Sequence, residues 1–166
     1  MAHYDWSTFT RRITINADVK TIYVAWATSN ALEKWFLRSA KFKTADGKIR
    51  HPNHLVKMKD TYAWTWHGHS DKIVERGKVL KANGKDNFKF VFGKAGIVSV
   101  SIFKEKGETI CEIVQSEIPT DEKSKVDFHV GCSVGWTFYL ANLKSFLECG
   151  TDLRNRNEKI KNVVSS

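Results

Sequence analysis

The sequence contains few cysteines and prolines and no long apolar run. Its 166 residues include three cysteines and two prolines. Cys111, Cys132 and Cys149 lie far apart and lack the Cys-x-x-Cys spacing of metal or redox sites, which favours buried thiols in a reducing compartment. No stretch approaches the roughly 20 apolar residues that span a bilayer, and the N-terminus lacks the basic-then-apolar order of a signal peptide. We therefore expect a cytoplasmic protein that does not insert into membranes.

The composition indicates one globular domain. Hydrophobic residues make up 42% of the chain and charged residues 27%, which argues against intrinsic disorder. The length is sufficient to bury a hydrophobic core without disulfides. We expect a single domain over residues 1–166, with its core at about residues 8–150, a short N-terminal tail and a charged C-terminal tail.

Positive charge is in excess, with a formal net charge of +9. A field of this sign favours anionic partners, such as nucleic acid, a phospholipid surface or an acidic protein. The lysines and arginines are scattered, however, and no recognisable nucleic-acid motif organises them. We expect a solvated basic surface and no specific nucleic-acid partner, with an acidic protein as the alternative.

The N-terminal part of the chain predicts one strand followed by two short helices. Apolar and polar residues alternate over residues 8–16, as in a half-buried strand. Asp18 is placed to cap a first helix. A second helix is predicted to begin at Ser29 or Asn30, where Asn30 and Glu33 match a capping box.

Strand patterns then dominate up to residue 119, and one long helix follows. The predicted strands are FLRSAKFK, DTYAWTWHG, KIVERGKVLKA, NFKFVFG and a hairpin over residues 96–119 that turns at Lys106-Gly107. The segment GWTFYLANLKSFLECG, residues 135–150, carries apolar residues at steps of three and four and ends at Gly150, as an amphipathic helix does.

These elements predict an α+β fold. Sequential strands pair as an antiparallel sheet, and its apolar face needs a cover that only the long helix can provide. We expect a curved antiparallel sheet of about seven strands, two short helices after the first strand, and a long C-terminal helix across the concave face.

The chain resembles the START-like superfamily, also called SRPBCC or helix-grip, and within it the family of activators of the 90-kDa heat-shock protein ATPase. The resemblance covers about residues 8–153 and is carried by ALEKWF, DTYAWTWHG and, most specifically, GWTFYLANLKSFLECGTDLR. Lys59 stands where relatives often have glycine, so the loop before Asp60 is expected to differ. Two-domain relatives also need a separate preceding domain to activate the chaperone. Because the first predicted strand begins at Thr8, direct chaperone activation is not our leading expectation.

The resemblance also implies an apolar ligand between the long helix and the sheet. The aromatic rows could equally fill a packed core, since rings that line a void and rings that fill one have the same periodicity. The strand pattern also leaves open whether Glu112 or Gln115 points inward. The residues predicted to form the ligand cavity are Trp64, Trp66, Phe88, Phe90, Gln115, Trp136, Tyr139 and Leu143.

Signals for catalysis or metal binding are weak. His67 and His69 are spaced to share a strand face, but the residues after them suggest a turn, which favours solvated histidines over a zinc site. His129 and Cys132 could meet on one helical turn. No orienting carboxylate is evident beyond Asp127, and Cys132 lies on the predicted buried stripe. We predict no catalytic residue, no metal and no cofactor.

These observations predict a non-catalytic module that binds a hydrophobic or amphipathic small molecule between the long helix and the sheet. Residues 44–57 and 119–130 are expected to border the entrance. An alternative is an interaction module that binds a chaperone or another acidic protein through its basic surface. A START-like enzyme is a third interpretation, and it would need a polar group deep in the cavity.

Overall fold

The structure of the protein is a computed structural model that describes residues 4–160 and 163–164. The last part of the predicted charged tail, at residues 161–162 and 165–166, lies outside the described residues, as do residues 1–3. A seven-stranded sheet has the order β1-β7-β6-β5-β4-β3-β2, and all neighbouring strands are antiparallel. The strands are β1 (Phe9–Thr14), β2 (Ser39–Lys43), β3 (Thr61–Thr65), β4 (Glu75–Ala82), β5 (Asn87–Val91), β6 (Ile97–Glu105) and β7 (Glu108–Ser116).

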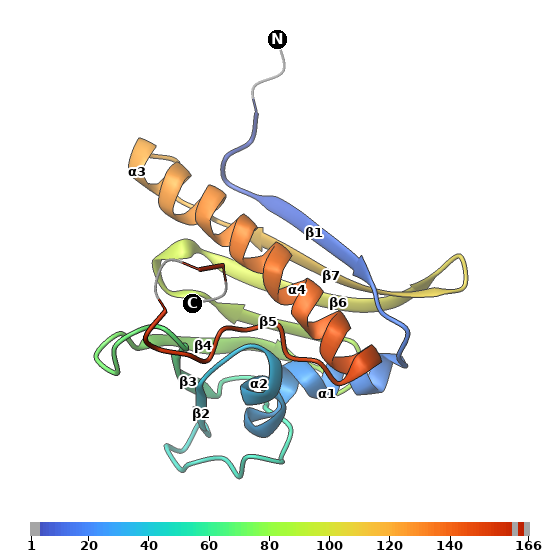
Figure 1. The fold of residues 1–166 in the computed structure, drawn as a ribbon. Helices are drawn as coiled ribbons and strands as arrows, with labels where there is room; N and C mark the ends of the chain where they lie inside the picture. The colour runs from blue at the N-terminus through green and yellow to red at the C-terminus, as the bar shows by residue number, and fades with distance from the viewer. Residues whose placement is uncertain (1–3, 161–162, 165–166) are drawn as a thin grey trace.

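Two groups of helices complete the fold. Figure 1 shows the long helix α4 crossing one face of the sheet, with α1 and α2 near its C-terminal end. We call the face that packs against α4 the inner face. This arrangement confirms the predicted α+β fold. The helices are α1 (Val19–Ala27), α2 (Ser29–Trp35), the short turn η1 (Gly93–Ala95), α3 (Glu122–Ser124), the π-helical turn η2 (Lys125–Val130) and α4 (Gly131–Cys149).

The two short helices begin at side-chain caps. Asp18 accepts a hydrogen bond of 2.6 Å from the Thr21 backbone N–H, as predicted. The second helix starts at Ser29, but its cap is Thr28. The predicted capping box of Asn30 and Glu33 is therefore wrong. The Glu33 carboxylate instead accepts a hydrogen bond from the Ala40 N–H, which ties α2 to β2.

The long helical region begins earlier than residue 135. Asp121 caps α3, and η2 continues directly into α4. A π-helical turn holds more residues per turn than an α-helix, so it interrupts the spacing of 3.6 residues that sequence patterns detect. At the other end the prediction holds, because Gly150 adopts φ 70° and its N–H donates to the Phe146 carbonyl oxygen.

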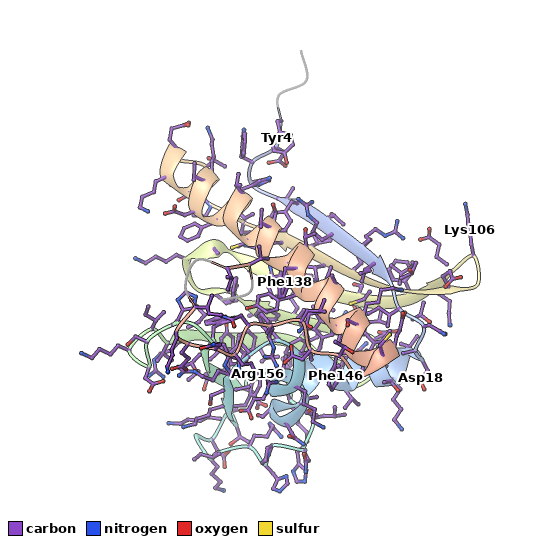
Figure 2. All side chains as sticks on the ribbon, in the orientation of Figure 1. Tyr4, Asp18, Lys106, Phe138, Phe146 and Arg156 are labelled. Atoms are coloured by element: carbon purple, nitrogen blue, oxygen red, sulfur yellow. The ribbon has the colours of Figure 1, made fainter. Side chains whose placement is uncertain are left out.

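The strand register settles which residues of β7 point inward. Cys111, Ile113 and Gln115 are fully buried on the inner face. Glu112 points outward and forms an ion pair with Arg12 on β1, at 3.2 Å. The turn of the β6–β7 hairpin, which carries Lys106, lies at the end of the sheet opposite to α3 (Figures 1 and 2).

The segment between β2 and β3 packs on the short helices. The Val56 N–H donates to the Ala27 carbonyl oxygen, and the Asn30 N–H donates to the Pro52 carbonyl oxygen. Lys59 adopts φ 76°, the conformation that glycine favours, at the turn where relatives often have glycine. No helix in the described part of the chain has both the length and the apolar character needed to cross a bilayer.

Candidate functional site

Two adjoining hollows lie between the N-terminal part of α4 and the sheet. The first has a volume of about 180 Å³ and the second about 430 Å³. Both are lined by Phe92 and Cys132, so they adjoin at these two side chains, and we call the two hollows together the α4 groove. The first hollow is otherwise lined by Phe36, Trp66, Asp127, Gly131, Gly135, Trp136 and Tyr139, and the second by Glu75, Gly93, Lys94, Ala95 and Phe128.

Aromatic rings from four parts of the chain form the wall of the first hollow. The Phe36 ring, at the end of α2, lies 5.2 Å from the Trp136 ring and 4.8 Å from the Tyr139 ring, measured between centroids. Trp66 and Phe92 follow β3 and β5, and the Phe92 ring is 5.6 Å from that of Trp136. These are normal distances for stable aromatic pairs. Trp66, Phe92 and Tyr139 are only partly buried and present ring surface to the groove.

The groove stays open because α4 has glycines where it faces the first hollow. Gly131 and Gly135 are four residues apart and therefore lie on one side of the helix. A Cβ atom placed on Gly135 would have no atom within 4 Å. Glycine inside a helix lowers stability by roughly 1 kcal/mol relative to alanine. The empty space beside Gly135 shows that close packing is not the reason for a glycine at this position. The small residues instead leave room in front of the rings.

A buried polar side chain fixes the orientation of the Trp136 ring. Trp136 Nε1 donates to Gln115 Oε1 at 2.8 Å, and Gln115 Nε2 donates to the Ala95 carbonyl oxygen at 2.8 Å. Gln115 is completely buried, so each of these hydrogen bonds replaces one that water would have made. The Cys132 thiol also lies beside Gln115, and burial raises its pKa.

The predicted cavity residues separate into two groups. Trp66, Trp136 and Tyr139 line the α4 groove, and Gln115 lies behind Trp136. The others are completely buried in the core and line neither hollow. The interior beneath the middle of α4 is therefore packed, and the open space lies at its N-terminal end. These core residues are Trp64, Phe88, Phe90 and Leu143.

The predicted entrance segments also differ in position. Residues 119–130 reach the groove, since Asp127 and Phe128 line it. Residues 44–57 do not line either hollow, because hydrogen bonds such as Val56 to Ala27 hold that loop against α1 and α2. The expectation that both segments border the entrance is therefore wrong for residues 44–57.

Glu75 is a candidate site residue that the sequence interpretation missed. It lies opposite Trp64 in the pairing of β3 with β4, and residues directly opposite each other share a face of the sheet. Its carboxylate is therefore on the inner face, where burial raises its pKa. The signal was present in the sequence, because Glu75 has the same strand parity as the apolar Val79, which is fully buried.

His129 and Cys132 do not form a catalytic pair. His129 is buried, and both of its ring nitrogens are engaged. Nδ1 lies 2.9 Å from the Trp6 carbonyl oxygen, which can only accept, so Nδ1 carries the proton. Nε2 lies 2.8 Å from the Tyr4 hydroxyl oxygen, which is its hydrogen-bond partner. No ring nitrogen remains to take a proton from Cys132.

Clusters of side chains that could hold a metal ion are also absent from the described residues. No cluster of three or more His, Cys, Asp or Glu side chains is close enough there to hold a metal ion. His67 lies after the end of β3, and burial together with nearby arginines lowers its pKa.

The outer face of the sheet has a separate, basic hollow. It has a volume of about 790 Å³ and lies over β2, β3 and β4, on the side away from α4. Lys41, Lys43 and Arg76 line it and are exposed. Asp71 lines it as well, and its carboxylate is paired with Arg38 at 2.5 Å.

The chain is similar to known proteins in sequence pattern and in fold. Residues 16–148 match the family described as Activator of Hsp90 ATPase homolog 1-like protein. No curated protein sequence matches the chain. A protein from Staphylococcus saprophyticus has a similar fold, with a TM-score of 0.67 and 14% identity over 89% of this chain and 96% of that chain.

Two further solved structures are similar. The Aha1 dimer from Colwellia psychrerythraea has a TM-score of 0.65 and 18% identity, covering 87% of this chain and 98% of that one. CalU16 from Micromonospora echinospora has a TM-score of 0.63 and 17% identity, covering 88% of this chain and 77% of that one. At these identities the similarity shows a shared fold.

Proposed function

The chain belongs to the family of Activator of Hsp90 ATPase homolog 1-like proteins, with a START-like fold, and we propose that it is a non-catalytic module that binds a hydrophobic or amphipathic small molecule in the α4 groove. The observation that carries this proposal is the set of partly exposed aromatic rings facing a glycine-lined stretch of helix. Trp66, Phe92 and Tyr139 present apolar surface to a hollow that α4 could have closed with larger side chains.

Burial of apolar surface would supply the affinity. Removal of apolar surface from water contributes roughly 25 cal/mol per Å², so a ligand that buries about 200 Å² gains about 5 kcal/mol before immobilisation costs. The hollow beside Gly135 suits an apolar group, and the adjoining second hollow enlarges the site. Binding of this kind is expected to be nearly independent of salt.

The compartment is part of the same proposal. Cys111, Cys132 and Cys149 are all free thiols. Free thiols persist in reducing surroundings, so we place the binding module in the cytoplasm.

The test is ligand binding by the full chain with a groove-filling variant. A panel of lipids, aromatic acids, aromatic amines and neutral aromatics is added while the melting temperature and the tryptophan fluorescence are recorded. Trp66 and Trp136 line the groove, so a bound ligand should change their emission. Gly135→Leu should place a side chain in the hollow and abolish binding while the protein remains folded.

Val134→Leu is the matched control, because Val134 is 60% exposed and lines neither hollow. It should bind ligands as the wild type does. If no compound in the panel raises the melting temperature or changes the fluorescence, the proposed function fails. Equal binding by the wild type and Gly135→Leu would place the ligand elsewhere and would also reject the groove.

Docking of an acidic protein is a second candidate function, favoured by the basic hollow on the outer face. Lys41, Lys43 and Arg76 present positive charge there without filling the hollow. The family name makes Hsp90 the first partner to test. Binding should weaken as salt rises and should be lost in Lys41→Glu/Lys43→Glu. Lys85→Glu, in the exposed turn between β4 and β5, is the control. Absence of binding at micromolar concentration in low salt would remove this candidate.

A further inference from the structure

The second hollow of the α4 groove is lined by a carboxylate. Glu75 projects from the start of β4 onto the inner face and lines this hollow with Phe92 and Cys132. The carboxylate lies against Gly93, since a Cβ atom built on Gly93 would be 2.9 Å from Glu75 Cδ. Gly93 adopts φ 47°, a conformation that glycine favours, and its lack of a side chain leaves room for the carboxylate in this position.

Among the described residues, this carboxylate has no positively charged partner. In the part of the chain that the structure describes, Glu75 makes no ion pair, although the protein has 27 lysines and arginines. The Arg76 backbone N–H lowers the pKa of Glu75, but burial outweighs it and raises the pKa. Lys94 also lines the hollow but is exposed and does not pair with Glu75. Asp127, the other acid of the groove, is already paired with Lys123.

The surroundings of Glu75 favour a cation over other ligands. Burial penalises an unpaired carboxylate, so a ligand that only covers it with apolar surface adds to that penalty. An anion would be repelled. A cation would be attracted by the carboxylate and also by the aromatic rings of the same hollow, Phe92 and Phe128. The net charge of +9 opposes cations at long range, but salt screens that effect beyond about 8 Å at physiological ionic strength.

We propose that the ligand of the α4 groove is an amphipathic organic cation, whose apolar part lies among the rings of the first hollow and whose ammonium group pairs with Glu75 in the second. This inference rests on the proposed function, since it assigns the ligand class of the same groove. Phe92 and Cys132 line both hollows, so the rings and the carboxylate lie on either side of the same two side chains, and the proposed ligand would span both hollows there.

The test compares three probes that share one ring system and differ in charge. The probes are 1-naphthylmethylammonium, the neutral 1-naphthylmethanol and the anionic 1-naphthoate, titrated into the full chain and followed by calorimetry. We expect the ammonium probe to bind about tenfold more tightly than the alcohol, as one charged hydrogen bond would provide, and naphthoate to bind most weakly.

Glu75→Gln keeps the shape of the side chain and removes its charge. It should weaken the ammonium probe about tenfold and change the alcohol less than about twofold. Glu112→Gln is the matched control, because it changes the net charge equally but lies on the outer face beside Arg12. It should bind all three probes as the wild type does. In the wild type, affinity for the ammonium probe should also fall at acidic pH as Glu75 becomes protonated, and Glu75→Gln should lack this dependence.

The outcomes separate the two proposals. If the alcohol and the ammonium probe bind equally well, and Glu75→Gln changes neither, the cation inference is overturned and the binding function stands. If Glu112→Gln weakens the ammonium probe as much as Glu75→Gln does, the effect is one of net charge and the inference is again overturned. If none of the probes and no compound of the wider panel binds, both proposals fail.

Discussion

Trp136 on α4 donates a hydrogen bond of 2.8 Å from its indole Nε1 to the side-chain oxygen of Gln115 on β7. Both residues are almost completely buried. The same amide donates to the Ala95 carbonyl oxygen in η1, so one side chain connects the long helix, the sheet and the turn beside the groove. The position of the Trp136 ring in the groove wall therefore depends on a polar contact as well as on packing.

Replacement of Gln115 by leucine should destabilise the protein. Gln115→Leu leaves the indole N–H of Trp136 and the carbonyl oxygen of Ala95 buried without partners. Each unsatisfied group costs roughly 1–3 kcal/mol, so we expect the free energy of unfolding to fall by about 2–4 kcal/mol. Urea unfolding measures this change.

A double-mutant cycle separates the hydrogen bond from the packing. Trp136→Phe removes the indole N–H, so Gln115→Leu should cost less in that background than in the wild type. If the cost of Gln115→Leu is the same in both backgrounds, the contact between the two side chains does not contribute to stability.

Replacement of Gly135 by alanine should stabilise the protein. The site is inside α4, and an added Cβ atom has no atom within 4 Å. The greater helix propensity of alanine should raise the free energy of unfolding by about 0.5–1 kcal/mol. Thermal unfolding checks this, with Ala141→Gly as the reverse substitution within the same helix. A lower melting temperature for Gly135→Ala would show that the space beside α4 is smaller than described.

The segment that follows α4 is anchored to α2 by Arg154. This segment runs back past α2 (Figure 1), and Figure 2 marks Arg156 on it. The buried Arg154 guanidinium donates to the carbonyl oxygens of Leu37 and Glu33 and pairs with Asp152 at 2.9 Å. Arg154→Met should lower the free energy of unfolding by about 3 kcal/mol, because it removes one partner of a buried ion pair. Arg156→Met, at a more exposed ion pair with Asp152, should change it by less than about 1 kcal/mol.

The loss of stability at acidic pH should depend on Asp152 and its ion pairs with Arg154 and Arg156. Burial alone would raise the pKa of Asp152, but hydrogen bonds from Arg154 and Arg156 outweigh it and hold the pKa well below its usual value. Because the folded pKa is lower than the unfolded one, the ionised carboxylate stabilises the fold above about pH 4, and this stabilisation is lost as the pH falls further. In Asp152→Asn, unfolding free energies measured from neutral to acidic pH should decline less steeply. A decline equal to that of the wild type would assign acid sensitivity to other groups.

The three thiols should react at different rates. Cys149 is exposed and should be modified first by a thiol reagent. Cys132 lies in the α4 groove with a raised pKa and should react slowly, and a bound ligand should protect it. Cys111 is fully buried, with a pKa raised to about 12, and should react only after unfolding. Mass spectrometry of the modified protein gives the order, and rapid labelling of Cys111 would contradict the packing of β7.

Much of the fold could be predicted from the sequence because it depends on local periodicity. Alternation over two residues identified the strands, and steps of three and four residues identified α4. Asp18 and Gly150 were recognised as helix ends because caps follow from neighbouring backbone groups. The start of the long helical region was missed, since the π-helical turn at Lys125–Val130 does not follow the α-helical period.

The candidate site was predicted only in part. Periodicity assigns a residue to a face but does not fix the distance between two faces. For this reason Trp66 and Trp136, which line the groove, could not be distinguished from Trp64, which is packed in the core. Glu75 was missed because a search for apolar faces does not single out one carboxylate. Its lack of a charged partner among the described residues depends on how distant segments pack together, which the sequence pattern does not give.

The sequence by itself determined the order of the elements and the apolar face of each, because hydrogen bonding and side-chain direction along one helix or strand are set by near neighbours. Only the tertiary structure decided where the helix and the sheet separate. That separation depends on side chains far apart in the chain, such as Gly135 on α4 and Trp66 after β3, whose combined volumes leave the α4 groove unfilled.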